Sequence, residues 1–358
     1  VYMNTKTKNR RLILTLAAGA AIGFCFAFVL GQYPYKDILF TVHDKPISNF
    51  SEWDEFKHSL LEKPVLNISL HNDDSETDHL SIANDLSIKI KVLCWVMTQP
   101  SHHKTQVKYI MDTWGKRCNK LLFMSSQEEP NLPVIKIKGI KKEGRDILWF
   151  KTKSSFNYIY KKYYNDYDWF MKVDDDTFVV VENLRYLLSK YDPNQPLYLG
   201  CQFKPYVKQG YMSGGAGYIL SKEALRRFIE EAMFNPRKCS QAASGAEDVE
   251  MGKCLESVKV IPVDTRDNKG RGRFFPFVPE HHLVPGLVSK DNWYWQYSYY
   301  PQKDGLECCS DTAISFHYVD QNLMYVLEYL IYHLRPYGLY NSVNSVSPST
   351  STESSSID

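Results

Sequence analysis

Between residues 88 and 190 the chain alternates between short apolar runs and longer stretches in which apolar residues recur at helical spacing. The apolar runs predict buried strands at 88–97, 121–124, 134–140 and 169–173. The helical spacing predicts helices at about 102–114, 146–164 and 179–190. This alternation is typical of βαβ units, so the sequence predicts an α/β fold with a mostly parallel sheet and ligands at the carboxyl ends of its strands.

The two ends of the chain differ from this central part. Residues 12–31 are uncharged, long enough to cross a bilayer, and follow the basic residues Lys6, Lys8, Arg10 and Arg11. A cleaved signal peptide is the alternative, but the apolar run is longer than an ordinary signal-peptide core. We expect a cytoplasmic tail at 1–11, a transmembrane signal anchor at 12–31, a polar stem at 32–87, a folded domain at 88–340 and a disordered Ser/Thr-rich tail at 341–358.

Charge and cysteine usage narrow the possible partners and the compartment. The 43 basic and 41 acidic side chains give a net charge of +2, so a nucleic acid polymer is not an expected partner. Cys25 lies in the predicted anchor, and the odd number of cysteines after it requires that at least one be free or intermolecular. Glycosylation sequons begin at Asn49 and Asn67 in the predicted stem. These features agree with a stem and folded domain in the secretory lumen.

The strand predicted at 169–173 ends abruptly in Asp174, Asp175 and Asp176. Three carboxylates at the end of a buried strand are costly unless a cation or a ring of donors faces them. Hard oxygen ligands of this kind suit Mg²⁺ or Mn²⁺, which keep positions open for the oxygens of a diphosphate. The alternative is a solvated loop in which Asp176 or Thr177 caps the next helix.

Two further segments have both a structural and a chemical interpretation. The glycines at 214, 215 and 217 permit a backbone to approach a flat ligand closely, or simply form a bulge or tight turn before a helix that Ser221 would cap. Asp248 follows Glu247 at the start of a predicted helix. It is a candidate general base, or only a favourable charge at a helix N-terminus.

The last candidates are aromatic and imidazole side chains. The run at 292–300 is rich in Trp and Tyr, whose rings can cover the C–H surface of a sugar, although most rings in such a run should be buried. His317 lies inside an apolar, strand-like segment, where a histidine is usually a hydrogen-bonded core residue. Added to a carboxylate pair, it would complete a metal shell and favour Mn²⁺ over Mg²⁺.

Several of these segments together resemble one family. They are, in order, Cys94-Trp95-Val96-Met97-Thr98, Glu143-Gly144-Arg145-Asp146, Asp174-Asp175-Asp176, Met212-Ser213-Gly214-Gly215, Glu247-Asp248, Trp293-Tyr294-Trp295, Cys308-Cys309-Ser310-Asp311 and Phe316-His317-Tyr318-Val319. The chain resembles the core 1 β1,3-galactosyltransferases, within the β1,3-glycosyltransferases, over about residues 88–339. The resemblance implies a GT-A fold, which is a Rossmann-like mixed sheet with flanking helices in a single lumenal catalytic domain.

The resemblance also implies an activity and a location. The family transfers galactose from UDP-galactose to the 3-hydroxyl of GalNAc on Ser or Thr of glycoproteins, with inversion and with Mn²⁺. Its members are single-pass type II membrane proteins of the Golgi, and a homodimer is a family expectation. The alternatives are a sister β1,3-glycosyltransferase with another donor or acceptor, a non-catalytic chaperone-like homologue on the same fold, or a metallohydrolase.

Site residues carry over by their match to the family motifs. Asp174, Asp176 and His317 would hold the metal, with Asp174 and His317 also at the donor. Asp248 would be the catalytic base that takes the proton of the acceptor hydroxyl. Trp293 and Tyr318 would meet the acceptor sugar. The remaining donor-binding residues would be Met97, Glu143, Gly144, Arg145 and Lys151.

Cysteine pairing is expected only in outline. Cys201 stands where the family carries a basic residue, which makes it a candidate for the free thiol. We expect Cys94 to pair with Cys118 and Cys239 with Cys254, while Cys308 and Cys309 would bridge each other or pair separately. Connectivity does not follow from sequence.

Overall fold

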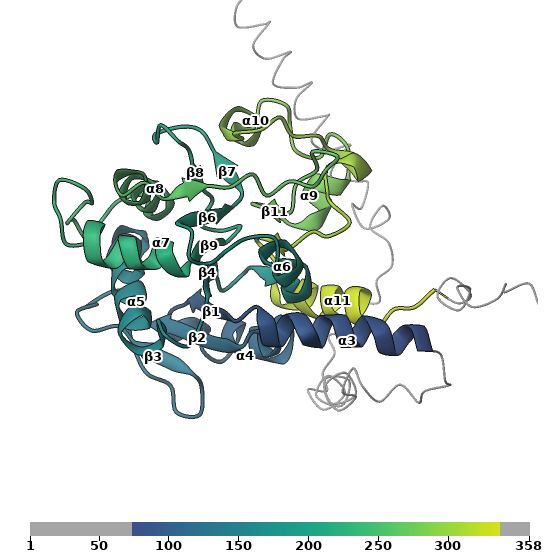
Figure 1. Ribbon diagram of the computed structural model, residues 1–358, viewed down its shortest axis with the longest axis horizontal. Coiled ribbons are helices and arrows are strands. Elements are labelled where there is room, and N and C mark those ends of the chain that lie inside the picture. The colour runs from purple at the N-terminus through teal and green to yellow at the C-terminus, as the bar shows by residue number, and fades with distance from the viewer. Residues whose placement is uncertain (1–73, 337–358) are drawn as a thin grey trace, which may run out of the picture. The chain divides into compact units, whose positions relative to one another are not determined.

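Seven strands form the central sheet of the computed structural model, which describes residues 74–336 (Figure 1). Their order across the sheet is β10-β6-β9-β4-β1-β2-β3, and β9 runs antiparallel to both β4 and β6. The strands are β1 (Val92–Met97), β2 (Lys120–Ser125), β3 (Val134–Lys136), β4 (Trp169–Asp174), β6 (Leu197–Gly200), β9 (Tyr218–Ser221) and β10 (Ile261–Pro262). The expected mixed, mostly parallel α/β sheet is therefore confirmed.

Helices flank the sheet, and two small sheets accompany it. The helices are α3 (Asp74–Lys89), α4 (Gln106–Asp112), α5 (Leu148–Tyr163), α6 (Val181–Leu188), α7 (Lys222–Arg227), α8 (Glu247–Ser257), α9 (Pro279–Leu283), α10 (Trp293–Tyr297) and α11 (Gln321–Tyr332), with shorter turns η1 (Pro100–His102), η2 (Trp114–Arg117), η3 (Arg145–Ile147), η4 (Phe228–Ala232) and η5 (Gly305–Glu307). One small sheet joins β11 (Phe274–Phe275), β12 (Ser315–Phe316) and β5 (Phe178–Val179), and the other pairs β7 (Gln202–Phe203) with β8 (Tyr211–Met212).

The central strand β1 is buried on both faces, which explains its uninterrupted apolar sequence. Val92, Cys94 and Val96 pack into a core with residues of α4, α6 and α11. Leu93 and Trp95 pack into a second core with residues of α5, α7 and α8. Figure 1 shows α5 and α7 on one side of the sheet and α6 and α11 on the other. The sheet is thus held between two helical layers, and its strand ends are left to build a site.

Element boundaries differ from the sequence prediction in three places. A strand beginning at residue 88 is wrong, because α3 continues to Lys89 and packs against α6. The helix expected at 102–114 is divided into η1, α4 and η2, and the strand expected at 134–140 is only β3. The polar α3 segment lacks a clear helical period, so tertiary packing rather than local pattern determines it.

Three disulfides are present among the described residues. Cys94 pairs with Cys118, Cys239 with Cys254, and the adjacent Cys308 and Cys309 with each other. Cys201 has no disulfide partner in this part of the chain. The expected pairings are confirmed, and so is the bridged alternative for the adjacent pair.

Several expectations fall on residues that the structure does not describe. The predicted tail at 1–11, the anchor at 12–31, most of the stem, both sequons and the segment 341–358 all lie outside residues 74–336. Within the described residues no helix is both long enough and apolar enough to span a bilayer.

Candidate metal centre and active site

The aspartate triplet ends β4 at the carboxyl edge of the central sheet. Pairing of β4 with β1 places Asp174 opposite Met97, the last residue of β1. The following turn is fixed by the Thr177 hydroxyl, which donates a hydrogen bond to the Gly215 carbonyl oxygen over 2.8 Å. Helix α6 begins after Val180 without a side-chain cap. The capping alternative for Asp176 or Thr177 is therefore wrong.

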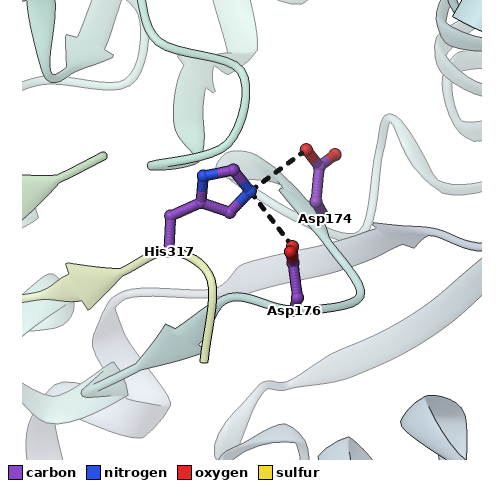
Figure 2. A group of neighbouring side chains, drawn as sticks. All are labelled: Asp174, Asp176 and His317. Atoms are coloured by element: carbon purple, nitrogen blue, oxygen red, sulfur yellow. Dashed lines mark ion pairs between the residues drawn. The ribbon is translucent and has the colours of Figure 1, made fainter. Parts of the chain in front are cut away.

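His317 converges with two of the three aspartates (Figure 2). Its Nε2 lies 3.1 Å from Asp176 Oδ1 and 3.9 Å from Asp174 Oδ2. The potential ligand atoms of these three residues all lie within 4.8 Å of one another. Strand β12, which ends just before His317, pairs with β5, which begins one residue after the triplet. The small sheet therefore brings together residues that are far apart in sequence.

The His317 ring is held in the orientation that a metal ligand needs. Its Nδ1 lies 3.3 Å from the Pro276 carbonyl oxygen, a contact that holds the ring with its Nε2 toward the two carboxylates. Burial lowers the pKa of His317, but hydrogen bonding and attraction from Asp176 and Asp174 outweigh it, so the pKa is raised. Two carboxylates and one imidazole form a donor set suited to a divalent metal cation.

The glycine-rich segment makes room for this ring. A Cβ atom built on Gly215 would lie 2.2 Å from the Cε1 atom of His317, so no other residue fits here without a shift. Among the described residues, the flat group that lies against Gly215 is thus the His317 imidazole, and the expected approach to a flat ligand stays a prediction. Gly217 adopts φ +79°, which favours glycine, and a Cβ there would lie 2.8 Å from Val173.

Gly215→Ala should therefore displace the His317 ring and weaken divalent-cation binding about tenfold, because partners that orient a ligating imidazole contribute that much to affinity. Mn²⁺ titration by electron paramagnetic resonance measures the change. Gly286→Ala is the control, since Gly286 has φ +78° but no atom within 4 Å of an added Cβ. Equal metal affinity in both variants would contradict the proposed fit between glycine and imidazole.

The middle aspartate, Asp175, contacts the loop after β1. Asp175 Oδ2 accepts hydrogen bonds from Thr98 Oγ1 at 2.6 Å and contacts His102 Nδ1 at 2.8 Å. The hydrogen bond to Asp175 raises the pKa of His102. Sequence reasoning missed both partners. Thr98 directly follows β1 and belongs to one of the family motifs, whereas His102 ends η1 and belongs to none of them.

Some residues expected at the donor form one connected group. The Lys151 ammonium donates to Glu143 at 2.9 and 3.0 Å and to the Thr98 carbonyl oxygen. Burial lowers the pKa of Lys151 against the opposing effect of Glu143. Glu143 also accepts from the Ser126 amide at 3.1 Å. These contacts join the ends of β1 and β2 to the start of α5, next to buried Met97.

Gly144 and Arg145 lie at the turn that leads into α5. Gly144 precedes η3, and its neighbour Arg145 is exposed. Its guanidinium makes no hydrogen bond or ion pair with residues 74–336. Of the residues expected at the donor, Arg145 is the one whose cation remains available to an incoming anion.

Asp248 lies in the first turn of α8, beside the glycine-rich segment. Its Oδ2 accepts a hydrogen bond from the Gly214 amide at 3.2 Å, and its Oδ1 accepts from the Val249 amide at 2.9 Å. Burial raises the pKa of Asp248. A carboxylate with a raised pKa is a stronger proton acceptor than an exposed one.

A lysine in the middle of β4 connects Asp174 with the start of α8. The Lys172 side chain is 2% exposed, and its ammonium lies 2.6 Å from Asp174 and 3.6 Å from Glu247. Burial opposes the charged form of Lys172, but the two carboxylates outweigh it, so its pKa is raised. Sequence reasoning missed Lys172, although a single lysine inside an apolar strand was a visible signal.

The two residues expected at the acceptor lie on either side of one phenylalanine. Trp293 is 42% exposed and Tyr318 is 56% exposed. The Phe277 ring centre lies 5.7 Å from that of Trp293 and 6.3 Å from that of Tyr318, with which it stacks. Tyr318 also stacks on His317 at 3.9 Å and adopts φ +58°, a strained value for a residue other than glycine.

A pocket of about 320 Å³ opens beside Asp175 and Asp176. Tyr109, Tyr318 and the first residues of α11 form its other walls. Space, exposed aromatic rings and the candidate metal ligands therefore meet at one sheet edge, where α/β folds bind their ligands.

Comparison with known proteins gives consistent matches. Residues 88–267 match the Fringe-like family. The chain is similar to glycoprotein-N-acetylgalactosamine 3-beta-galactosyltransferase 1 of Xenopus laevis, with 44% identity over 326 residues, which cover 91% of this chain and 86% of that protein.

More distant relatives match about half of the chain. A beta-1,3-glucosyltransferase of Mus musculus is 26% identical over 48% of this chain and 34% of its own length. Human chondroitin sulfate synthase 3 is 29% identical over 45% of this chain and 20% of its own length. All three relatives bear names of enzymes that build glycans.

Proposed function

This chain belongs to the Fringe-like family of glycosyltransferases, and on that premise we propose that it transfers galactose from UDP-galactose to the 3-hydroxyl of GalNAc on Ser or Thr of glycoproteins. The observation that carries the proposal is the convergence of Asp174, Asp176 and His317 at the edge of the sheet. The similarity to the Xenopus enzyme over 91% of the chain supports the choice of donor and acceptor.

The donor set fits Mn²⁺ as the cofactor. His317 offers an oriented Nε2, and Asp174 and Asp176 offer hard oxygens at compatible distances. When bound, a divalent cation stabilises the negative charge that develops on a departing diphosphate. The chain's own contribution is to hold these three side chains at one point of the sheet edge.

Other donor contacts come from the loops after β1 and β2. Arg145 would bind the diphosphate through its available guanidinium. Lys151 binds Glu143 and the Thr98 carbonyl oxygen. We therefore propose that Lys151 and Glu143 hold the walls of the nucleotide pocket in place. Met97 and Gly144 would line that pocket.

Asp248 is the proposed base. In an inverting transfer the acceptor 3-hydroxyl gives its proton to Asp248. The oxygen of that hydroxyl forms a bond to galactose C1, and the bond from C1 to the UDP oxygen breaks. One carboxylate suffices, in contrast to a glycoside hydrolase, where a second acid protonates the leaving oxygen. The buried position of Asp248 suits this task because burial raises its pKa.

Trp293 and Tyr318 would form the acceptor side. Their exposed rings present flat apolar surfaces and hydrogen-bonding tips, which match the two faces of a GalNAc unit.

We also propose a Golgi location with a lumenal catalytic domain, a type II anchor at 12–31 and a homodimer, as in the family that the sequence resembles.

The direct test uses the purified full-length protein in detergent with Mn²⁺. UDP-galactose and a GalNAc-bearing peptide should together release UDP and yield a galactosylated peptide. Transfer of another sugar from a panel of sugar nucleotides would identify a sister enzyme instead. Donor breakdown without acceptor would indicate a hydrolase, and the absence of any turnover would favour a non-catalytic homologue.

A further inference from the structure

We infer that Lys172 is a positioning residue for the transfer reaction, because one buried ammonium group holds both the metal-binding Asp174 and the start of the helix that carries Asp248. This inference rests on the proposed function. It adds a residue outside the metal ligands, the base and the donor or acceptor contacts. Its basis is three polar contacts of the Lys172 Nζ atom, together with the close packing around that atom.

The first contact uses one of the two carboxylate oxygens of Asp174 and leaves the other for the metal. The Lys172 ammonium donates to Asp174 Oδ1 over 2.6 Å, while Asp174 Oδ2 faces His317. A carboxylate with one oxygen held has a fixed plane, so the other oxygen is aimed at the candidate metal position. Lys172 thereby acts on Asp174 as Pro276 acts on His317.

The second and third contacts lead to the base. Lys172 Nζ also donates to the Gly214 carbonyl oxygen over 3.1 Å, and the amide of the same Gly214 donates to Asp248 Oδ2. On the other side, Lys172 lies 3.6 Å from Glu247, the residue that precedes Asp248. The ammonium thus reaches both the hydrogen-bond partner and the chain neighbour of Asp248.

Glu247 is itself held from two directions. Its Oε1 accepts hydrogen bonds from the Tyr218 hydroxyl at 2.7 Å and from the Thr152 hydroxyl at 3.0 Å. The Glu247 side chain is 7% exposed. Its contacts attach the first turn of α8 to β9 and α5, which leaves little freedom for the position of Asp248.

The atoms around the Lys172 ammonium are also closely packed. A Cβ atom on Gly214 would lie 2.9 Å from Glu247 Oε2 and 3.4 Å from Lys172 Nζ. The Tyr218 ring centre lies 5.9 Å from the same Nζ. The ammonium and Glu247 are therefore enclosed, so removing the ammonium alone leaves Glu247 as an uncompensated buried charge.

A purely structural role makes a different prediction. Lys172 could serve only to neutralise the buried Glu247, with no consequence for Asp174 or Asp248. In that case removing both charges together should restore full activity. If Lys172 positions the two reacting sides, the double change should restore stability but leave the reaction slow.

The test compares Lys172→Met, Lys172→Met with Glu247→Gln, Glu247→Gln alone, and the exposed control Lys190→Met, all in the full chain. We expect Lys172→Met and the double variant to lower kcat about 100-fold and to weaken Mn²⁺ binding about tenfold, as outer-shell partners of metal ligands do. The KM for the acceptor should change less than about threefold. Lys190→Met should behave as the unaltered protein.

The melting temperature separates the possible explanations. It should fall in Lys172→Met and recover in the double variant, while kcat stays low. A double variant with normal kcat and normal Mn²⁺ affinity would overturn the inference. If neither variant that carries Lys172→Met folds, the kcat of Glu247→Gln is the deciding measurement, since this substitution keeps the size of the side chain. A folded Glu247→Gln protein with full kcat contradicts the inference, and a kcat lowered about tenfold supports it.

Failure of the proposed function looks different. In that case the unaltered protein would transfer no galactose to the acceptor, whatever kcat the variants show. Mn²⁺ affinity then still reports on the contact between Lys172 and Asp174, because that measurement requires no turnover.

Discussion

Asp176→Ala should lower kcat at least about 1000-fold, because it removes one of the three side chains that would hold the divalent cation. The stabilisation of a leaving diphosphate by a bound cation is worth several kcal/mol, and each 1.4 kcal/mol is a factor of ten in rate. Asp176 is 37% exposed, and its backbone carbonyl, which accepts from the Val319 amide, remains in the variant. The fold should therefore survive.

The measurement is a steady-state assay over a series of Mn²⁺ concentrations, together with a thermal melt. Asp311→Ala is the matched control, because Asp311 is 79% exposed and forms only a surface ion pair with Arg271. Excess Mn²⁺ should rescue part of the activity if metal affinity is what was lost. Full activity of Asp176→Ala at low Mn²⁺ would show that Asp176 is not a ligand.

Asp248→Asn should lower kcat by about 100- to 10,000-fold, the usual contribution of a general base. The amide has the size of the carboxylate but cannot take the acceptor proton. Mn²⁺ affinity and the KM for UDP-galactose should stay close to normal, because Asp248 contacts the Gly214 and Val249 amides rather than the metal ligands. This pattern distinguishes loss of the base from loss of the metal.

A second acid on α8 provides the control. Glu250 also lies in the first turn and pairs with Lys253 on the surface. If the acids of this turn serve only the helix dipole, Asp248→Asn and Glu250→Gln should have similar, small effects. If Asp248 is the base, only Asp248→Asn should slow the reaction. Equal activities of the two variants would contradict our assignment.

Asp248→Asn should change the stability at neutral pH only slightly, because relief from burying a charge offsets the loss of one of the two backbone amide hydrogen bonds that Asp248 accepts. Burial raises the pKa of Asp248 in the folded protein above its value in the unfolded chain. The ionised carboxylate therefore lowers the stability fully at pH values above the folded pKa, and this loss disappears as the pH falls below the unfolded pKa. The neutral amide avoids this cost. A functional carboxylate that reduces stability is common at active sites.

The sequence predicted those parts of the site that local pattern determines. The run before Asp174 is a strand because every residue from Trp169 to Val173 is buried. Ser221 caps α7 by accepting from the Ala224 amide, as its position before a helix indicated. In both cases the information lies within a few neighbouring residues, where strand and helix rules apply.

The remaining parts depend on contacts that no local pattern encodes. His317 meets the aspartates only because β12 pairs with β5, both of which are two residues long. Lys172 of β4 reaches Glu247 at the start of α8, and α3 forms against α6 in a segment without a clear period. Family resemblance supplied the first of these associations, while the other two became visible only in the fold.

The central claim is that Asp174, Asp176 and His317 together hold a divalent cation at the donor diphosphate. Anomalous diffraction at the manganese edge, from crystals grown with Mn²⁺ and UDP, measures this most directly. We predict one strong peak about 2.0–2.3 Å from an oxygen of each aspartate and from His317 Nε2, with diphosphate oxygens at the remaining positions. A manganese peak elsewhere, with these three side chains facing solvent, would contradict the claim.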